Sequence, residues 1–254
     1  MKTFFLSLFL FAVSGFFVVS PAQQARFDQA TNQLEQNELR EAIEMYKSIE
    51  EEGYKSGALW LNMGITYTYL DSLGIAKYYF LRAGQFTETK TRADEALVYV
   101  NERFNRRSAV LPRLPWNRFF ESLSQNAGVT FLFVSAFFFL YAGIGAVLVS
   151  WFKKRIPPIL KHSGTVSILI SVVIFGSALY IDYLDNRYGT GVMIEQQITV
   201  HEQPHTESAS VSTAYEGYTM QVDHHRSDQQ AGWTYVRLEN GMYGWLEEDN
   251  IMVF

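Results

Sequence analysis

Two uncharged apolar segments, VTFLFVSAFFFLYAGIGAVLVSWF (129–152) and GTVSILISVVIFGSALYI (164–181), decide the architecture of this 254-residue chain. Each is close to the roughly 20 apolar residues that a helix needs to cross a bilayer core. Neither contains Asp, Glu, Lys, Arg or His, and in lipid a lone segment satisfies its backbone groups only as a helix. They predict two transmembrane helices, at 128–152 and 164–181.

The loop between these helices, residues 153–163, sets their orientation. It has no acidic residue and four basic ones, Lys153, Lys154, Arg155 and Lys161. Basic loops stay on the cytoplasmic side, so both flanks of the hairpin are predicted to lie outside. Pairs of small residues one turn apart, Ala142 with Ala146 and Ser167 with Ser171, favour close packing within the hairpin or against a partner protein.

Residues 1–22 have the layout of a cleavable secretory signal. Lys2 precedes an apolar run that ends in the small residues Ser20-Pro21-Ala22, which predicts cleavage after Ala22. An uncleaved membrane helix is the alternative. Either form leaves the following segment on the outer side.

Residues 23–107 repeat a pattern with an offset of 34 residues. The second copy resembles the tetratricopeptide repeat, because small and aromatic residues recur at that family's spacing. These framework residues are Trp60, Met63, Gly64, Tyr67, Ala76, Phe80 and Ala83. The first copy matches mainly in its second helix, and a third helix at about 92–106 is predicted to cap the array. Such arrays generally bind peptide segments in a groove, and the resemblance implies the same here.

Residues 108–127 form a Pro- and aromatic-rich linker next to the first span. Trp116, Phe119, Phe120 and Leu123 fall on one side of a short predicted helix. This stripe predicts a helix on the outer membrane surface, with a plain linker as the alternative. A second linker is predicted at 182–191.

Residues 192–254 change to a pattern of alternating runs rich in Val, Tyr and Trp, which predicts a small antiparallel β domain. Asn240-Gly241 predicts a tight hairpin turn with positive φ at both residues. The order of glycines and tryptophans resembles the bacterial SH3-type barrel. That resemblance implies a peptide- or glycopeptide-binding groove lined by Trp233, Tyr235, Tyr243 and Trp245. For Trp233 and Trp245 a framework role is equally favoured.

Several functional classes find no support in the composition. The chain has no cysteine, which excludes disulfides and thiolate chemistry. Residues 185–254 hold 11 acidic and three basic residues, a net charge of −8, which disfavours nucleic acid. His201, His205, His224 and His225 lie near predicted turns, and their spacing on a strand does not favour a shared metal. We expect no catalytic, metal or cofactor site.

The complete order, a signal, a tetratricopeptide array, a two-helix transmembrane hairpin and a small all-β SH3-like barrel, resembles the BatE-type proteins of bacterial aerotolerance operons. This resemblance implies a non-enzymatic inner-membrane scaffold with both modules in the periplasm. The implied protein partners are von Willebrand A-domain membrane proteins linked to a MoxR-type ATPase. The alternative is a membrane protein that binds or senses peptidoglycan.

Overall fold

The computed structural model describes residues 21–106, 108–112, 115–152 and 158–254. The predicted signal sequence therefore lies outside the described residues, except for Pro21 and Ala22, which open the first described helix. The chain divides into two compact units, residues 1–105 and 106–254. The predicted helical array, two long apolar helices and antiparallel sheet are all confirmed.

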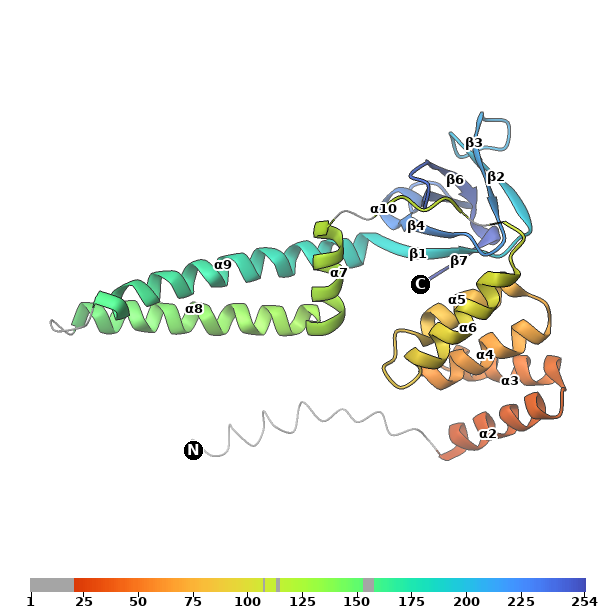
Figure 1. Ribbon diagram of the computed structural model, residues 1–254, viewed down its shortest axis with the longest axis horizontal. Coiled ribbons are helices and arrows are strands. Elements are labelled where there is room, and N and C mark those ends of the chain that lie inside the picture. The colour runs from red at the N-terminus through yellow and green to blue at the C-terminus, as the bar shows by residue number, and fades with distance from the viewer. Residues whose placement is uncertain (1–20, 107, 113–114, 153–157) are drawn as a thin grey trace. The chain divides into compact units, whose positions relative to one another are not determined.

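The first unit is an array of helix pairs (Figure 1). Its helices are α2 (Pro21–Glu35), α3 (Leu39–Glu51), α4 (Gly57–Tyr69), α5 (Leu73–Ala83) and α6 (Lys90–Arg103). Ser56 caps α4, because its hydroxyl accepts a hydrogen bond from the Leu59 amide at 3.1 Å. The predicted capping helix begins two residues earlier and ends three residues earlier than 92–106.

The 34-residue period is present in the backbone. Asn37 and Asp71, which are 34 residues apart, both have positive φ, at 64° and 58°. The turns that contain them close with matching hydrogen bonds, Glu38 N–H to the Gln33 carbonyl at 2.9 Å and Ser72 N–H to the Tyr67 carbonyl at 3.0 Å. Side chains at equivalent positions of the two pairs are buried alike, namely Ala42 with Ala76, Tyr46 with Phe80, and Ile49 with Ala83.

The second unit contains a hairpin of two helices, α8 (Val129–Phe152) and α9 (Pro158–Arg187). Both are long and apolar enough to cross a membrane. The predicted loop 153–163 is too long, because α9 already begins at Pro158. Proline suits the first position of a helix, because an N–H at that position would have no hydrogen-bond acceptor within the helix.

The linker predicted at 182–191 is wrong. The helix α9 continues to Arg187, and strand β1 (Tyr188–Met193) begins at the next residue. Polar side chains support the extra turns of helix, because Asn186 Nδ2 donates to the Asp182 carbonyl at 2.8 Å. The β domain therefore begins at residue 188 rather than 192, and it follows the helix without a spacer.

Small residues pack the two long helices together. Ser167 Oγ and Ser171 Oγ each donate a 2.7 Å hydrogen bond across the hairpin, to the carbonyls of Phe139 and Ala136. At Gly143 an added Cβ would lie 2.7 Å from Ile168 Cγ1 and 2.9 Å from the Gly164 carbonyl oxygen. The Ser167 and Ser171 pair thus serves packing within the hairpin, whereas Ala142 is exposed.

The helix α7 (Pro115–Ala127) crosses one end of the hairpin (Figure 1). Phe120 contacts Tyr180 with ring centroids 5.0 Å apart, and Leu123 packs against the buried cluster of Leu132, Ala178 and Ile181. Trp116 and Phe119 remain exposed. The predicted single stripe is therefore divided, because part of it packs on the hairpin and part faces away.

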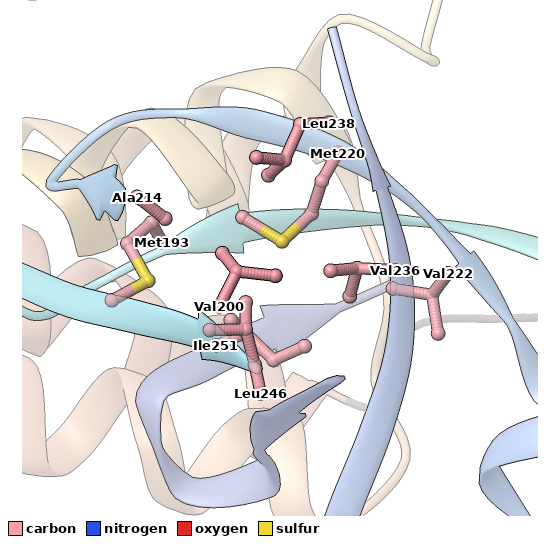
Figure 2. Close-up of a cluster of buried hydrophobic side chains, with 9 residues drawn as sticks. All are labelled: Met193, Val200, Ala214, Met220, Val222, Val236, Leu238, Leu246 and Ile251. Atoms are coloured by element: carbon pink, nitrogen blue, oxygen red, sulfur yellow. The ribbon is translucent and has the colours of Figure 1, made fainter. Parts of the chain in front are cut away.

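The β domain is one seven-stranded antiparallel sheet with the strand order β3-β2-β6-β5-β4-β1-β7. After β1 come β2 (Gln197–His201), β3 (Ser210–Tyr215), β4 (Thr219–Asp223), the short helix α10 (His224–Ser227), β5 (Trp233–Leu238), β6 (Tyr243–Glu247), the 3₁₀ turn η1 (Glu248–Asn250) and β7 (Ile251–Val253). Figure 2 shows the core, which is formed by Met193, Val200, Ala214, Met220, Val222, Val236, Leu238, Leu246 and Ile251.

The turn predicted at Asn240-Gly241 joins β5 to β6, but its backbone differs from the expectation. Gly241 has φ +87°, whereas Asn240 is not among the described residues with positive φ. The loop is longer than two residues, because Leu238 N–H bonds to the Met242 carbonyl at 2.9 Å and Gly241 N–H bonds to the Leu238 carbonyl at 2.9 Å. Only the glycine needs the left-handed conformation in such a loop.

We predict that Gly143→Val destabilises the helical hairpin, because its side chain would collide with Ile168 and the Gly164 backbone. Overpacking of this kind typically costs about 1–3 kcal/mol. Gly145→Val is the matched control, since nothing lies within 4 Å of a Cβ there. Unfolding in mixed detergent micelles measures the difference. Equal losses for the two variants would show that the Gly143 contact does not hold the hairpin together.

Candidate binding surfaces

Four aromatic side chains gather on one side of the β sheet. In β5 and β6 the residues Thr234, Val236, Leu238, Gly244 and Leu246 are buried, and the residues between them are not. This alternation follows from the two-residue period of a strand. It places the four predicted groove residues together on the opposite side, which we call the aromatic face: Trp233, Tyr235, Tyr243 and Trp245.

The rings of the aromatic face contact one another across the strands. Tyr235 lies opposite Trp245 in the register, with ring centroids 5.1 Å apart in an edge-on arrangement. Tyr235 also stacks with Tyr243 at 6.3 Å and an interplanar angle of 18°. The rings of Trp233 and His201 lie perpendicular to each other, with centroids 5.7 Å apart. The two tryptophans are half-buried and lie outside the core of Figure 2.

A hollow of about 250 Å³ adjoins this region. Its lining is mostly polar and comes from β2 and the end of β6: Gln197, Ile198, Thr199, His201 and Glu247. His201 contacts Trp233, and Glu247 lies opposite Trp233 in the strand register. The hollow and the aromatic face therefore share a border at Trp233.

In the helical unit the predicted repeat framework is structural. All seven framework residues are buried: Trp60, Met63, Gly64, Tyr67, Ala76, Phe80 and Ala83. Gly64 explains the need for a small residue, because a Cβ there would lie 2.6 Å from the Phe80 ring. Tyr67 stacks on Tyr79 with ring centroids 5.6 Å apart. These side chains hold neighbouring helices together, and of the seven only Phe80 also borders an open groove, described below.

A partly buried polar cluster, which the repeat pattern does not reveal, joins three helices of the array. The Glu50 carboxylate of α3 accepts hydrogen bonds from Trp60 Nε1 at 2.9 Å and from the Tyr79 hydroxyl at 3.1 Å. Arg82 forms an ion pair with Glu50, and its guanidinium lies 3.7 Å from the centroid of the Trp60 ring. Burial, with a contribution from the Glu50 charge, raises the pKa of the Tyr79 hydroxyl well above its ordinary value.

An open groove of about 400 Å³ lies between α4 and α6. We call it the α4–α6 groove, and it is lined by Ile65, Thr68, Tyr69, Asp71, Leu73, Phe80, Ala96, Tyr99 and Arg103. Tyr69 and Tyr99 are exposed, and the Arg103 guanidinium lies 3.7 Å from the centroid of the Tyr99 ring. Exposed aromatic and arginine side chains are the residue types most often found at binding hot spots.

The histidines do not assemble a metal site. His201 Nδ1 lies 3.3 Å from the Ser208 carbonyl oxygen, and His205 Nε2 lies 3.4 Å from the side-chain carbonyl of Gln203. His224 and His225 belong to α10. Within the part of the chain that the structure describes, no three His, Cys, Asp or Glu side chains come together as a metal would require.

Asp223, the neighbour of His224, has a different role from the histidines. It is 7% exposed and forms an ion pair with Arg187 at the end of α9, with Nη2 and Oδ2 2.9 Å apart. Its other carboxylate oxygen accepts the Arg226 amide at 3.2 Å and caps α10. One carboxylate thus joins the end of the long helix to the β domain.

Three of the four residues predicted to set the membrane topology lie outside the residues that the structure describes. Lys153, Lys154 and Arg155 belong to residues 153–157, which the structure does not describe. Lys161 lies in the first turns of α9 rather than in a loop. Their predicted role depends on charge near the membrane and stays a prediction.

We predict that Glu50→Gln destabilises the helical unit by about 2 kcal/mol, since it leaves the poorly exposed Arg82 without its counter-ion. Glu52→Gln is the matched control, because the Glu52–Arg26 pair is exposed and surface pairs contribute little. Thermal unfolding of the two variants measures this difference. Equal shifts in Tm would contradict a special role for the Glu50 cluster.

Comparison with models of protein families finds no match to this chain, and comparison with curated proteins likewise finds none. The function is therefore argued from the geometry of the aromatic face, the α4–α6 groove and the hairpin.

Proposed function

We propose that this protein is a non-enzymatic scaffold that presents two binding modules on one membrane anchor. The observation that carries the proposal is the pairing of two open surfaces, the α4–α6 groove and the aromatic face, on separate units of a chain that also contains the apolar hairpin. Each surface displays aromatic and arginine side chains. Such surfaces suit the binding of protein segments.

Within this proposal the helical unit is a tetratricopeptide array and the β domain is a bacterial SH3-type barrel. The 34-residue backbone repeat and the small residue Gly64 against Phe80 support the first assignment. The small antiparallel sheet, with Trp233 and Trp245 at the start of β5 and within β6, supports the second. The order of these parts supports membership of the BatE-type family.

The proposed location is the bacterial inner membrane, with two spans and both modules in the periplasm. Exposed apolar side chains cover the hairpin, among them Phe138, Tyr141 and Val173, and they would contact lipid. The basic residues at 153–161 favour a cytoplasmic position for the closed end of the hairpin. The secretory signal predicted at residues 1–22 favours export of the helical unit.

The proposed partners are membrane proteins with von Willebrand A domains, linked to a MoxR-type ATPase, as the family resemblance implies. A shared anchor would raise the effective concentration of one partner for the other, so that two weak sites act together. Binding rather than chemistry is the activity that we propose for both surfaces.

A second candidate function is recognition of peptidoglycan by the β domain. The observation in its favour is the polar hollow beside Trp233, where Gln197, Thr199, His201 and Glu247 offer hydrogen-bonding groups next to an aromatic ring. Such a mixture of rings and convergent polar groups is typical of small-ligand sites. Sedimentation of the purified protein with cell-wall sacculi tests this alternative.

We predict that the double variant Tyr69→Ala/Tyr99→Ala recovers about tenfold less partner protein than the unmodified chain, because it lacks the exposed rings of the α4–α6 groove. The measurement is crosslinking in native membranes, affinity purification of the full chain and quantification of the attached proteins. Val98→Ala is the matched control, since Val98 is 60% exposed on the same helix but does not line the groove.

Deletion of the whole array provides the stronger comparison for the same measurement. If the double tyrosine variant and the array deletion both recover the same proteins in the same amounts as the unmodified chain, the helical unit has no scaffold function. The proposal requires that Val98→Ala keeps its partners while the other two variants lose them.

A further inference from the structure

Positively charged side chains are scarce in the β domain, and its two arginines both lie against the aromatic face. Residues 188–254 contain ten Asp and Glu residues but only two basic ones, Arg226 and Arg237. Arg226 belongs to α10 and Arg237 to β5, so the two come from different elements. Both side chains are nevertheless held against rings of the aromatic face.

The two guanidinium groups and two tyrosine rings form a ladder. The Arg226 guanidinium lies 4.5 Å from the centroid of the Tyr235 ring, and that of Arg237 lies 5.3 Å from the centroid of the Tyr243 ring. The two tyrosines stack on each other at 6.3 Å. Arg237 and Tyr243 are also direct cross-strand neighbours. We call Arg226, Tyr235, Tyr243 and Arg237 the arginine–tyrosine ladder.

Both guanidiniums are open to an anionic ligand. Arg226 and Arg237 are exposed, and within the described ranges neither forms an ion pair. Arg82 and Arg187 behave differently, because Arg82 is paired with Glu50 and Arg187 with Asp223. A ring that supports the flat side of a guanidinium leaves the N–H groups at its edge free to donate.

From this geometry we propose that the arginine–tyrosine ladder binds acidic peptide segments, with a carboxylate on each guanidinium. Arginine presents a planar fork that matches a carboxylate, and such charge-assisted hydrogen bonds are stronger than neutral ones. The acidic residues of the domain would repel anions over much of its remaining surface. Arg106, whose guanidinium lies 4.7 Å from the centroid of the Tyr215 ring, offers a single positive charge there, whereas the ladder offers two.

A peptide fits the accessible shape better than a glycan does. Tyr243 is 49% exposed, whereas Trp233 and Trp245, the broadest rings, are half-buried. Glu247, opposite Trp233, would repel a carboxylate at that border. An extended peptide rises about 3.3 Å per residue and alternates its side chains. A segment of about five residues can therefore reach both ends of the ladder with acidic side chains on one side.

This inference supplies the ligand chemistry of the second module and depends on the proposed scaffold only for its cellular role. It is tested with the purified full-length chain in detergent micelles. The probe is a fluorescein-labelled hexapeptide of alternating glutamate and alanine, and the control peptide carries glutamine instead of glutamate. Fluorescence anisotropy at low and high salt reports the binding.

We expect the glutamate peptide to bind, the glutamine peptide not to bind, and added salt to weaken the complex. Arg226→Gln and Arg237→Gln should each weaken binding by about tenfold, and the double variant should abolish it. Lysine at either position should restore part of the affinity, since it keeps the charge but not the planar fork. Arg106→Gln is the matched control, because the Arg106 guanidinium also lies on a tyrosine, 4.7 Å from the centroid of the Tyr215 ring, but outside the ladder.

Three results would overturn the proposal. Equal binding of the glutamine peptide would show that charge is not recognised. Unchanged affinity in both ladder variants, or an equal loss in Arg106→Gln, would place the site elsewhere. Sedimentation with sacculi that depends on Arg226 and Arg237, without peptide binding, would replace the peptide by a cell-wall ligand. None of these results alters partner recovery through the α4–α6 groove, so the two proposals fail separately.

Discussion

An ion pair between Arg187 and Asp223 joins the end of α9 to the β domain. The helix ends at Arg187, the sheet begins at Tyr188, and Asp223 at the end of β4 holds the last helical side chain at 2.9 Å. Because the same carboxylate caps α10, its loss would affect both the joint and the element that carries Arg226. The orientation of the arginine–tyrosine ladder thus depends on the contact that fixes the domain to the hairpin.

Small residues pack α8 closely against α9, the helix that leads into the β domain. Gly143 and Gly164 bring α8 and α9 into contact, and Ser167 and Ser171 add hydrogen bonds across the interface. Such contacts are the usual means of helix association in lipid, where burial of apolar surface gives little advantage. At the end nearest the β domain, α7 adds Phe120 and Leu123 to the same packing.

The features that the sequence predicted are those with a local period. The two apolar helices, the 34-residue repeat and the alternating strands each repeat a spacing that secondary structure imposes. Contacts between distant residues left no such signal. The sequence around Arg187 does not indicate that Asp223 is its partner. Likewise, Glu50, Trp60, Tyr79 and Arg82 come into contact only when three helices pack together. The resemblance to the SH3-type barrel implied the four aromatic groove residues, but the two arginines on their rings come from a turn of helix and a strand that only the fold brings together.

Double electron–electron resonance between spin labels on α9 and the β domain tests the central claim most directly, that the Arg187–Asp223 ion pair holds the β domain at the end of α9. The chain has no cysteine, so Val173→Cys and Gln221→Cys, both at exposed positions, provide unique labelling sites. We predict a single narrow distance distribution that broadens in Asp223→Asn. A flexible Gly-Ser insertion between Arg187 and Tyr188 supplies the reference for a loose joint. A distribution in the unmodified joint as broad as that of the insertion variant would contradict the account.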